Sequence, residues 1–213
     1  MHQKPPFPNC VFVTGIGTDI GKTVVATILC KALNADYWKP VQAGNLEQSD
    51  SVFVSSFGVQ VHAEAYKFFT PASPHHAAAL EGKSVSLQQI SLPYTPNRLV
   101  IEGAGGVMVP LNEQEVILDL IVCLKTPAIV VSKNYLGSIN HTILSCEMLH
   151  AAGVEIAGIV FNGVSTPSSE EWILNFTDLN LLGNIAEANE ISKEFIDAQA
   201  LKMREQISLH YTI

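Results

Sequence analysis

The stretch Val13-Thr14-Gly15-Ile16-Gly17-Thr18-Asp19-Ile20-Gly21-Lys22-Thr23 decides how the rest of the chain is interpreted. It follows the apolar residues 10–13 and leads into residues 22–33, whose pattern is helical. A strand, a glycine-rich turn and a helix in this order bind phosphate through backbone N–H groups and the helix N-terminus. Lys22 and Thr23 are the residue types that reach terminal phosphates and ligate Mg2+ in such loops. The sequence therefore predicts a nucleotide site after its first strand.

The glycines of this loop fit neither of the two common nucleotide-binding patterns. An ordinary P-loop has a glycine six residues before its lysine, and Ile16 holds that place, with Gly15 and Gly17 on either side. The dinucleotide pattern G-x-G-x-x-G fails because Ile20 occupies its last position.

Asp19 places a carboxylate in a loop that binds anions. Two unit charges about 4 Å apart repel by about 4 kcal/mol at an effective dielectric constant near 20. We therefore expect either that a cation offsets this charge, Mg2+ or an amine on a second substrate, or that Asp19 turns outward into water.

The composition indicates one domain covering residues 1–213. Hydrophobic residues make up 47% of the chain, and no long polar or Pro/Gly/Ser-rich linker divides it. The 20 acidic and 12 basic residues give a net charge of −8 with no Lys/Arg cluster, which argues against nucleic-acid and membrane partners. No stretch predicts a membrane span or an export signal. Cys10, Cys30, Cys123 and Cys146 lack C-x-x-C spacing, so we expect a cytoplasmic protein with reduced, mostly buried thiols.

Apolar runs rich in β-branched residues alternate with helical patterns along the chain. We predict strands at residues 10–14, 36–41, 98–102, 128–132, 155–162 and 181–186. We predict helices at residues 22–33, 50–57, 138–152, 169–176 and 192–208, and an extended loop with a short helix within 68–92. The alternation predicts an α/β fold of three layers, a mostly parallel β-sheet flanked by helices, with ligands at the carboxyl ends of the strands.

Charged residues stand where several of these strands end. Lys39 precedes Pro40 at the end of the second apolar run and is either a surface charge or part of the site. Glu102 ends the third run before a turn of small residues, which is how P-loop enzymes present a carboxylate to their metal. Asp50 either caps the helix after it or supplies a second carboxylate near that metal.

The histidines add little to this predicted site. His75 and His76 are adjacent on a loop, without the spacing or partners of a metal site. His141 follows the turn 136–140, in which Ser138 is expected to cap a helix. The free N–H groups of that helix either serve an ordinary cap or receive a carboxylate.

Together these residues resemble the dethiobiotin synthetases, a family of ATP-dependent enzymes of biotin biosynthesis. The shared motifs are V-T-G-x-x-T-[DE]-x-G-K-T at residues 13–23, K-P-V at 39–41, S-D at 49–50, S-P-H at 73–75, E-G-A-G-G at 102–106 and L-G-x-I-N-H at 136–141. They stand in order and span most of the chain. The resemblance implies a P-loop NTPase-like fold and a homodimer with the substrate site near its interface.

The resemblance also implies a reaction and the residues that perform it. Members of the family join CO2 to 7,8-diaminononanoate and close a cyclic urea, through an N7-carbamate and a carbamic-phosphoric mixed anhydride, while ATP becomes ADP and phosphate. The implied catalytic residues are Thr18, Lys22 and Lys39, and the implied Mg2+ ligands are Thr23, Asp50 and Glu102. The implied nucleotide-binding residues are Asp19, Ile20, Gly21, Lys22, Thr23, Val24, Asp50, Glu102, Gly103, Ala104, Gly105 and Asn162. The implied diamine-binding residues are Asp19, Lys39, Ala43, Leu136, Gly137, Ser138 and Asn140.

Two departures from the family pattern concern the nucleotide. Gly163 follows Asn162 where the family commonly has an aspartate, and residues 183–187 lack a usual proline, so the preference for ATP over other nucleotides stays open. Two alternatives also stay open: another ATP-dependent synthetase of the same class, and a partitioning or switch ATPase. Gly17 argues against the switch ATPases, because their signature lysine lies five places before the P-loop lysine.

Overall fold

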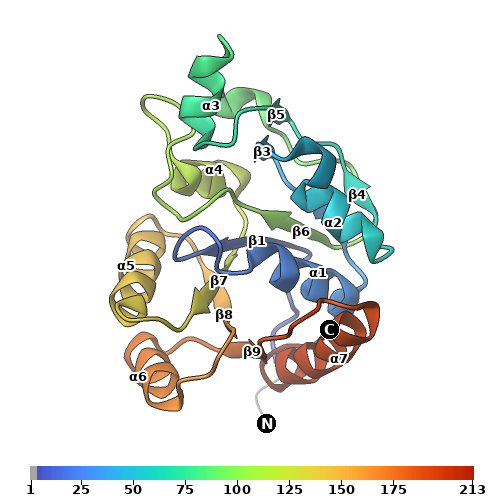
Figure 1. Ribbon diagram of the computed structural model, residues 1–213. Coiled ribbons are helices and arrows are strands. Elements are labelled where there is room, and N and C mark those ends of the chain that lie inside the picture. The colour runs from blue at the N-terminus through green and yellow to red at the C-terminus, as the bar shows by residue number, and fades with distance from the viewer. Residues whose placement is uncertain (1–3) are drawn as a thin grey trace.

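The computed structural model describes residues 4–213, in which strands and helices alternate along most of the chain (Figure 1). The strands of the main sheet are β1 (Cys10–Gly15), β2 (Asp36–Trp38), β4 (Val61–His62), β6 (Leu99–Glu102), β7 (Ala128–Lys133), β8 (Ile156–Asn162) and β9 (Leu181–Ile185). The helices are α1 (Lys22–Leu33), α2 (Asp50–Ser56), α3 (Pro74–Leu80), α4 (Ile117–Leu124), α5 (Ser138–Ala151), α6 (Pro167–Thr177) and α7 (Lys193–His210). A second, small sheet contains β3 (Val41–Ala43) and β5 (Tyr66–Phe68).

The main sheet has seven strands in the order β4-β2-β6-β1-β7-β8-β9, and its neighbouring strands pair in parallel. β1 lies at the centre between β6 and β7, with Val13 opposite Glu102 and Gly15 opposite Val131. The carboxyl ends of parallel strands meet at one edge, which is where open α/β sheets bind ligands. The loop after β1 and the carboxylate that ends β6 therefore lie side by side.

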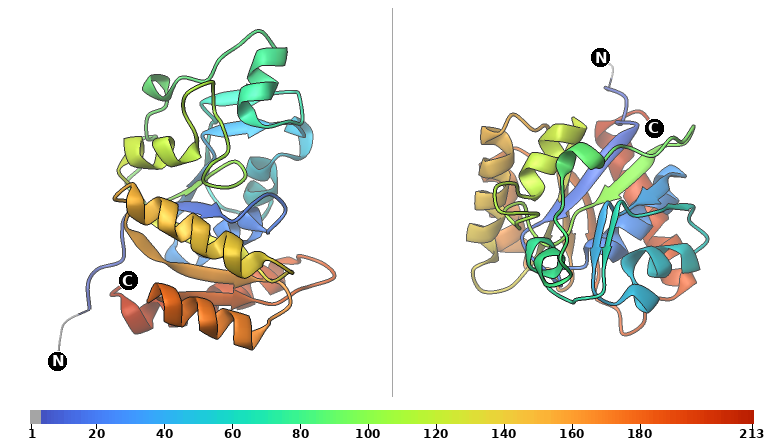
Figure 2. Two further views of the ribbon diagram at one scale, coloured as in Figure 1. Left: turned by 90° about the vertical axis from the view of Figure 1, so that its left-hand side faces the viewer. Right: turned by 90° about the horizontal axis from the view of Figure 1, so that it is seen from above.

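Helices cover both faces of this sheet, as the views in Figure 2 show. Side chains of β1 alternate between the faces, so that Val11 and Val13 pack in one hydrophobic cluster and Phe12 in the other. The first cluster contains buried side chains of α1, α2 and α7, and the second contains those of α3, α4, α5 and α6. The predicted three-layer α/β fold is confirmed.

Several predicted elements differ from the observed ones. The single strand predicted at residues 36–41 is wrong: β2 ends at Trp38, and β3 begins at Val41 in the other sheet. Pro40 explains the break, because it has no N–H group to donate to a ladder. The sequence pattern did not predict β4, β5 and α4, of which β4 and β5 are too short to show a period. The predicted loop with a short helix within 68–92 is confirmed by α3.

The cysteines of the described chain are all unpaired. Cys30 and Cys146 are buried, Cys10 is half-buried and Cys123 is exposed on α4, which agrees with thiols that are mostly, but not all, buried. Within residues 4–213, none of the helices combines the length and the apolar character that a membrane crossing requires.

Candidate active site

The loop between β1 and α1 is held in shape by glycines and by a side chain from β8. Gly21 has a φ of 85°, and a Cβ atom there would lie 2.1 Å from Nδ2 of Asn162. That Asn162 nitrogen donates a hydrogen bond of 2.8 Å to the carbonyl of Ile20. A side chain at position 21 would therefore break the contact between loop and sheet. Gly17, by contrast, has no atom within 4 Å of its hypothetical Cβ, which leaves its backbone open to a ligand.

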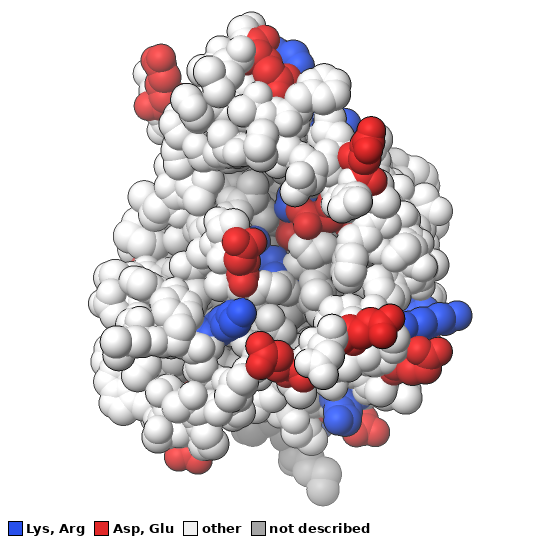
Figure 3. All heavy atoms as spheres, viewed as in Figure 1, with Lys and Arg blue, Asp and Glu red and all other residues white. Residues whose placement is uncertain are grey.

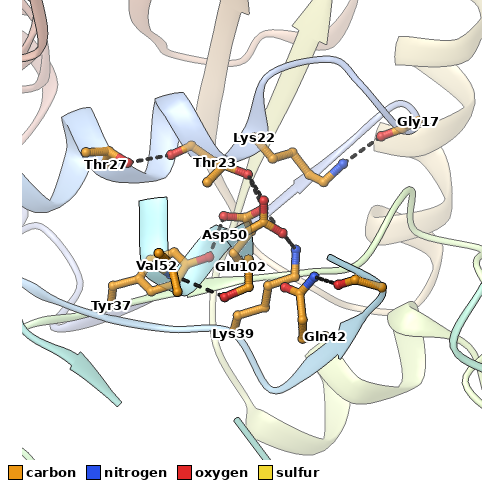
Figure 4. Close-up of polar contacts among 12 residues, drawn as sticks. Gly17, Lys22, Thr23, Thr27, Tyr37, Lys39, Gln42, Asp50, Val52 and Glu102 are labelled. Carbon is orange, nitrogen blue, oxygen red and sulfur yellow. Dashed lines mark hydrogen bonds and ion pairs between the residues drawn. The ribbon is translucent and has the colours of Figure 1, made fainter. Parts of the chain in front are cut away.

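An oxygen cluster lies beside this loop, where α1 begins and β6 ends (Figure 4). The Thr23 hydroxyl lies 2.8 Å from Oδ1 of Asp50 and 2.9 Å from Oε1 of Glu102. A hydroxyl has one proton, so it can donate fully to only one of these carboxylates at a time. Three oxygens thus converge with a single hydroxyl proton among them.

Lys39 supplies the nearest positive charge to this cluster. Its ammonium group pairs with Asp50 and lies 3.3 Å from Oε1 of Glu102. Lys39 is only 6% exposed, so the interpretation as a surface lysine does not hold. Pro40 ends the strand, and the side chain of Lys39 then points into the sheet edge instead of into solvent.

The structure also distinguishes the two roles considered for Asp50. Ser49 is the N-cap of α2 and accepts a 3.3 Å hydrogen bond from the backbone N–H of Val52. Asp50 occupies the next position, and its carboxylate faces Thr23 and Lys39. The helix is capped by its neighbour, which leaves Asp50 free to join the cluster.

The two lysines of the site have opposite pKa shifts. Burial lowers the pKa of Lys22 to about 8, and its Nζ donates 2.7 Å to the carbonyl of Gly17. Burial opposes the charge of Lys39 as well, but Glu102 and Asp50 outweigh it and raise the pKa of Lys39. Burial likewise opposes the charge of Asp50, while Lys39 and the Thr23 hydroxyl bring its pKa below the ordinary value.

A cavity of about 460 Å³ opens above these groups, and Figure 3 shows the hollow with acidic and basic atoms at its floor. Most of the predicted site residues near the loop line it, and two residues that the sequence analysis did not name, Gln48 and Phe53, do so as well. Neither gave a sequence signal, because their place in the site depends on how the 3₁₀ turn Leu46–Gln48 and α2 pack beside the loop. The lining residues are Thr18, Asp19, Gly21, Lys22, Thr23, Val24, Lys39, Gln48, Asp50, Phe53, Glu102 and Gly105.

Other predicted site residues support this cavity or lie outside its lining. Ile20 is 3% exposed and packs in the core, and a Cβ atom at Gly103 would lie 2.7 Å from the ring of Phe12. Ala104 packs against the core, and Ala43 belongs to the second sheet. Asp19 is exposed at the rim with a φ of 58°, so the choice between an outward and a ligand-facing carboxylate depends on what binds there.

The predicted carboxylate-binding turn lies in a separate cavity of about 750 Å³ at the start of α5. Gly137, with a φ of 102°, is the N-cap, so the predicted capping by Ser138 is wrong. Ser138 is instead the first helical residue, and its Oγ accepts a 3.3 Å bond from the N–H of Tyr135. The lining combines the predicted residues of this turn with Thr166, Ser169 and Trp172 at and after the start of α6, which no sequence pattern indicated. The lining residues are Asn134, Tyr135, Leu136, Gly137, Ser138, Ile139, Asn140, Ile143, Thr166, Ser169 and Trp172.

An apolar groove of about 390 Å³ lies between the loop and α5. Gly17 and Thr18 form its end at the loop, and Leu144 and Met148 form its wall on α5. Thr18 also lines the charged cavity, so the two spaces adjoin at that residue.

Comparisons with known proteins show which family the chain belongs to. A family model described as an AAA domain matches residues 9–194. A curated protein of Christiangramia forsetii, ATP-dependent dethiobiotin synthetase BioD, is 45% identical over 94% of this chain and 98% of its own length. The protein of the same name from Cytophaga hutchinsonii is 47% identical over 90% of this chain and 95% of its own length. The chain belongs to the dethiobiotin synthetase family.

Solved structures share the fold of this dethiobiotin synthetase family member at much lower identity. A ParA family ATPase from Chlorobium tepidum has a TM-score of 0.56 at 12% identity, over 95% of this chain and 97% of its own. A putative plasmid partition protein from Borrelia burgdorferi, bound to AMPPNP, has a TM-score of 0.57 at 10% identity, over 97% of this chain and 98% of its own. At such identities the likeness concerns the fold alone.

The oxygen cluster fits the magnesium ion that dethiobiotin synthetases are expected to use. Mg2+ prefers oxygen ligands and is commonly held by one or two carboxylates together with phosphate oxygens. Thr23, Asp50 and Glu102 offer a hydroxyl and two carboxylates that converge at the edge of the phosphate loop. A cation there would take over the charge balance that Lys39 now supplies.

Proposed function

We propose that this protein makes dethiobiotin from 7,8-diaminononanoate, CO2 and ATP, with release of ADP and phosphate. The observation that carries the proposal is the buried Lys39, which faces the oxygen cluster beside the phosphate loop. A second lysine at this place puts positive charge where a carbamate would receive a phosphoryl group. The family membership of the chain supports the same reaction.

The reaction proceeds in three steps. The unprotonated N7 amine adds to CO2 and loses a proton to give the carbamate. A carbamate oxygen attacks the γ-phosphorus, and ADP leaves with the electrons of the broken P–O bond. The second amine then attacks the carbamate carbon and loses a proton, phosphate leaves with the electrons of the broken C–O bond, and the ring closes. Phosphorylation converts a poor leaving oxygen into a good one, so the protein mainly positions the reactants and stabilises charge.

The nucleotide would lie over the loop, with its phosphates on the backbone N–H groups of Ile20 to Val24 and on Lys22. Gly103 to Gly105 would border it on the other side, and Asn162 would lie toward the base. When bound, Mg2+ neutralises phosphate charge. Thr23, Asp50 and Glu102 are the residues that would hold it.

The diamine would extend from the loop toward the turn that begins α5. Asp19 is the candidate partner for an amine at the loop, with Thr18, Lys39 and Ala43 near the reacting groups. The apolar groove suits a chain of methylene groups. The turn at residues 136–140 suits the distal carboxylate through the N–H groups at the start of α5 other than that of Ser138, which donates to the carbonyl of Tyr135.

We further propose a homodimer whose interface includes α5 and lies near this substrate site. Large apolar side chains are exposed on and beside α5, which is unusual for a surface that meets only water. They are Met108, Leu136, Leu144 and Met148. The free cysteines support a cytoplasmic location for the enzyme.

The test of the proposed function is nucleotide turnover with each substrate omitted in turn. ADP release should require both 7,8-diaminononanoate and bicarbonate, and product mass should match dethiobiotin. ATP, CTP and GTP assayed in parallel would establish the nucleotide preference that Gly163 leaves open. ATP turnover at the same rate with and without the diamine would exclude the synthetase function and favour a switch-type ATPase.

A further inference from the structure

Beneath the oxygen cluster, a buried tyrosine hydroxyl engages one oxygen of Glu102. Tyr37 lies on β2, is 0% exposed, and donates a 2.7 Å hydrogen bond to Oε2 of Glu102 (Figure 4). The other oxygen, Oε1, faces the Thr23 hydroxyl at 2.9 Å and the Lys39 ammonium at 3.3 Å. The two oxygens of this carboxylate therefore have different partners, and only Oε1 belongs to the oxygen cluster.

The strand explains how Tyr37 reaches this place. Tyr37 packs in the first cluster and Trp38 in the opposite one, and Lys39, directly after the strand, returns to the side of Tyr37, where both reach Glu102. On the adjacent strand β6, Val100 is the register partner of Tyr37, and Glu102 lies two residues further on. The phenol thus lies along the sheet surface and reaches Glu102 at Oε2, the oxygen opposite the one that faces Thr23 and Lys39.

We propose that Tyr37 is a positioning residue that makes Glu102 offer a single oxygen to the cation site and so favours Mg2+ over Ca2+. The inference rests on the proposed function only for the presence of a divalent cation in this site. Mg2+ needs near-octahedral coordination at short distances and takes carboxylates through one oxygen. Ca2+ accepts more oxygens and often takes both from one carboxylate. A hydrogen bond that occupies Oε2 and fixes the rotation of the carboxylate discriminates against the larger ion.

The fixed rotation depends on the burial of both groups. Glu102 is 1% exposed, so no bulk water can replace the phenol as donor to Oε2. Without the hydroxyl, that oxygen would be left without its partner and would turn toward whatever positive charge the cluster holds. In wild type the nearest alternatives, Thr23 and Lys39, already serve Oε1.

The experiment is the substitution Tyr37→Phe, which removes the hydroxyl and keeps the ring. The readout is the affinity for β,γ-imido-ATP, measured by calorimetry at saturating Mg2+ and at saturating Ca2+, because this analogue binds without turnover. We expect the ratio of the analogue's affinity with Mg2+ to its affinity with Ca2+ to fall about tenfold in Tyr37→Phe, at the low end of the roughly 10- to 100-fold that a hydrogen bond to a charged group contributes. An unchanged ratio would overturn the proposal.

Tyr211→Phe is the matched control. Tyr211 is also buried, and its hydroxyl donates a 2.8 Å bond to the carbonyl of Ala157, away from the oxygen cluster. Both variants lose one buried tyrosine hydroxyl, so a general loss of stability would affect both, whereas only Tyr37→Phe should shift the ion ratio. An equal shift in both variants would also overturn the proposal.

A crystal structure of the wild-type protein with Mg2+ and ADP gives a second test that does not depend on a folded variant. The Tyr37 hydroxyl should remain on Oε2, with only Oε1 directed at the ion or its waters. Both carboxylate oxygens on the ion would contradict the inference. Turnover that does not depend on the diamine would contradict the proposed function. It would not affect the comparison of Mg2+ with Ca2+, which tests the role of Tyr37 alone.

Discussion

Lys22 in the phosphate loop and Lys39 after the end of β2 are almost equally buried, at 7% and 6% exposure, yet they differ in their partners and in the direction of their pKa shifts. Lys22 has a neutral carbonyl as its hydrogen-bond partner, and burial lowers its pKa to about 8. Lys39 pairs with two carboxylates, which raise its pKa despite the burial. Similar burial therefore accompanies opposite pKa shifts in this site, and the counter-ions of Lys39 account for the difference.

The difference indicates two kinds of task. Lys22 is a charge that lacks a strong partner until a phosphate arrives, so its electrostatic energy improves on ligand binding. Lys39 already has its counter-ions, so ligand binding changes its energy less. We therefore expect Lys22 to act mainly on nucleotide affinity and Lys39 mainly on the reacting groups.

The largest expected effect is that of Lys39→Ala on turnover. Loss of one preorganised charge at developing negative charge costs on the order of 10²- to 10³-fold in kcat. The affinity for ADP, measured by calorimetry, should change by less than about threefold, because that interaction belongs to the transition state. Equal and modest losses in kcat and in ADP affinity would remove Lys39 from the catalytic residues.

The next effect concerns the affinity for nucleotide in Lys22→Met. A charge-assisted hydrogen bond contributes about 1.5–3 kcal/mol, so ADP binding should weaken by about 10- to 100-fold. Lys202→Ala, which removes an exposed lysine on α7, serves as the control and should leave ADP affinity unchanged. A Lys22→Met protein that bound ADP normally but turned over slowly would reverse the roles assigned to the two lysines.

Sequence alone predicts the part of this site that lies within short segments. The phosphate loop, Lys39 and Glu102 each end a strand, and the rule that parallel strands share a carboxyl edge brings them together. The fold class follows from the same alternation of strands and helices.

The rest of the site depends on contacts between distant segments. Asn162 braces Ile20 across 142 positions of sequence, and Tyr37 reaches Glu102 across 65. Nothing in the local pattern distinguishes Tyr37 from an ordinary core aromatic. Ser138 shows the opposite failure, because a typical capping residue is displaced by a glycine that can adopt the required positive φ.

ADP affinity should depend on pH through Lys22 and not through Lys39, with a change of about tenfold per pH unit. Lys22 is protonated below about pH 8 in the free protein, and a bound phosphate favours the charged form. ADP affinity should therefore be constant below pH 8 and fall about tenfold per unit above it, until the pKa of the complex is reached. Calorimetry in buffers of different ionisation enthalpy should detect proton uptake on binding above pH 8.

The same shift has a consequence for the unliganded protein. The pKa of Lys22 is lowered from its ordinary value of 10.5 in the folded state, so the charge costs stability below about pH 8 and that cost disappears as the pH rises toward 10.5. Lys22→Met should have neither dependence. A pH profile of ADP affinity that stayed the same in Lys22→Met would assign the titration to another group.

The smallest effect is expected for Asp19→Asn, which tests whether the loop carries its own counter-ion for the diamine. Asp19 is exposed at the rim, so solvent screens its charge, and diamine affinity should weaken by only about fivefold. Affinity for ADP should stay the same or rise slightly, because a like charge near the phosphates is removed. Asparagine tolerates the left-handed φ of 58° at this position, so the loop keeps its shape.

Asp178→Asn is the matched control, since Asp178 is exposed, has a φ of 53°, and lies at the end of α6 outside the residues that line the site. Calorimetry with 7,8-diaminononanoate in the presence of MgADP should show a loss in Asp19→Asn alone. An unchanged diamine affinity there would mean that the amine pairs with another group. Asp19 would then be a carboxylate that faces water. Of the charged groups in this comparison, Lys39 and its two counter-ions would be the ones left to act on the diamine.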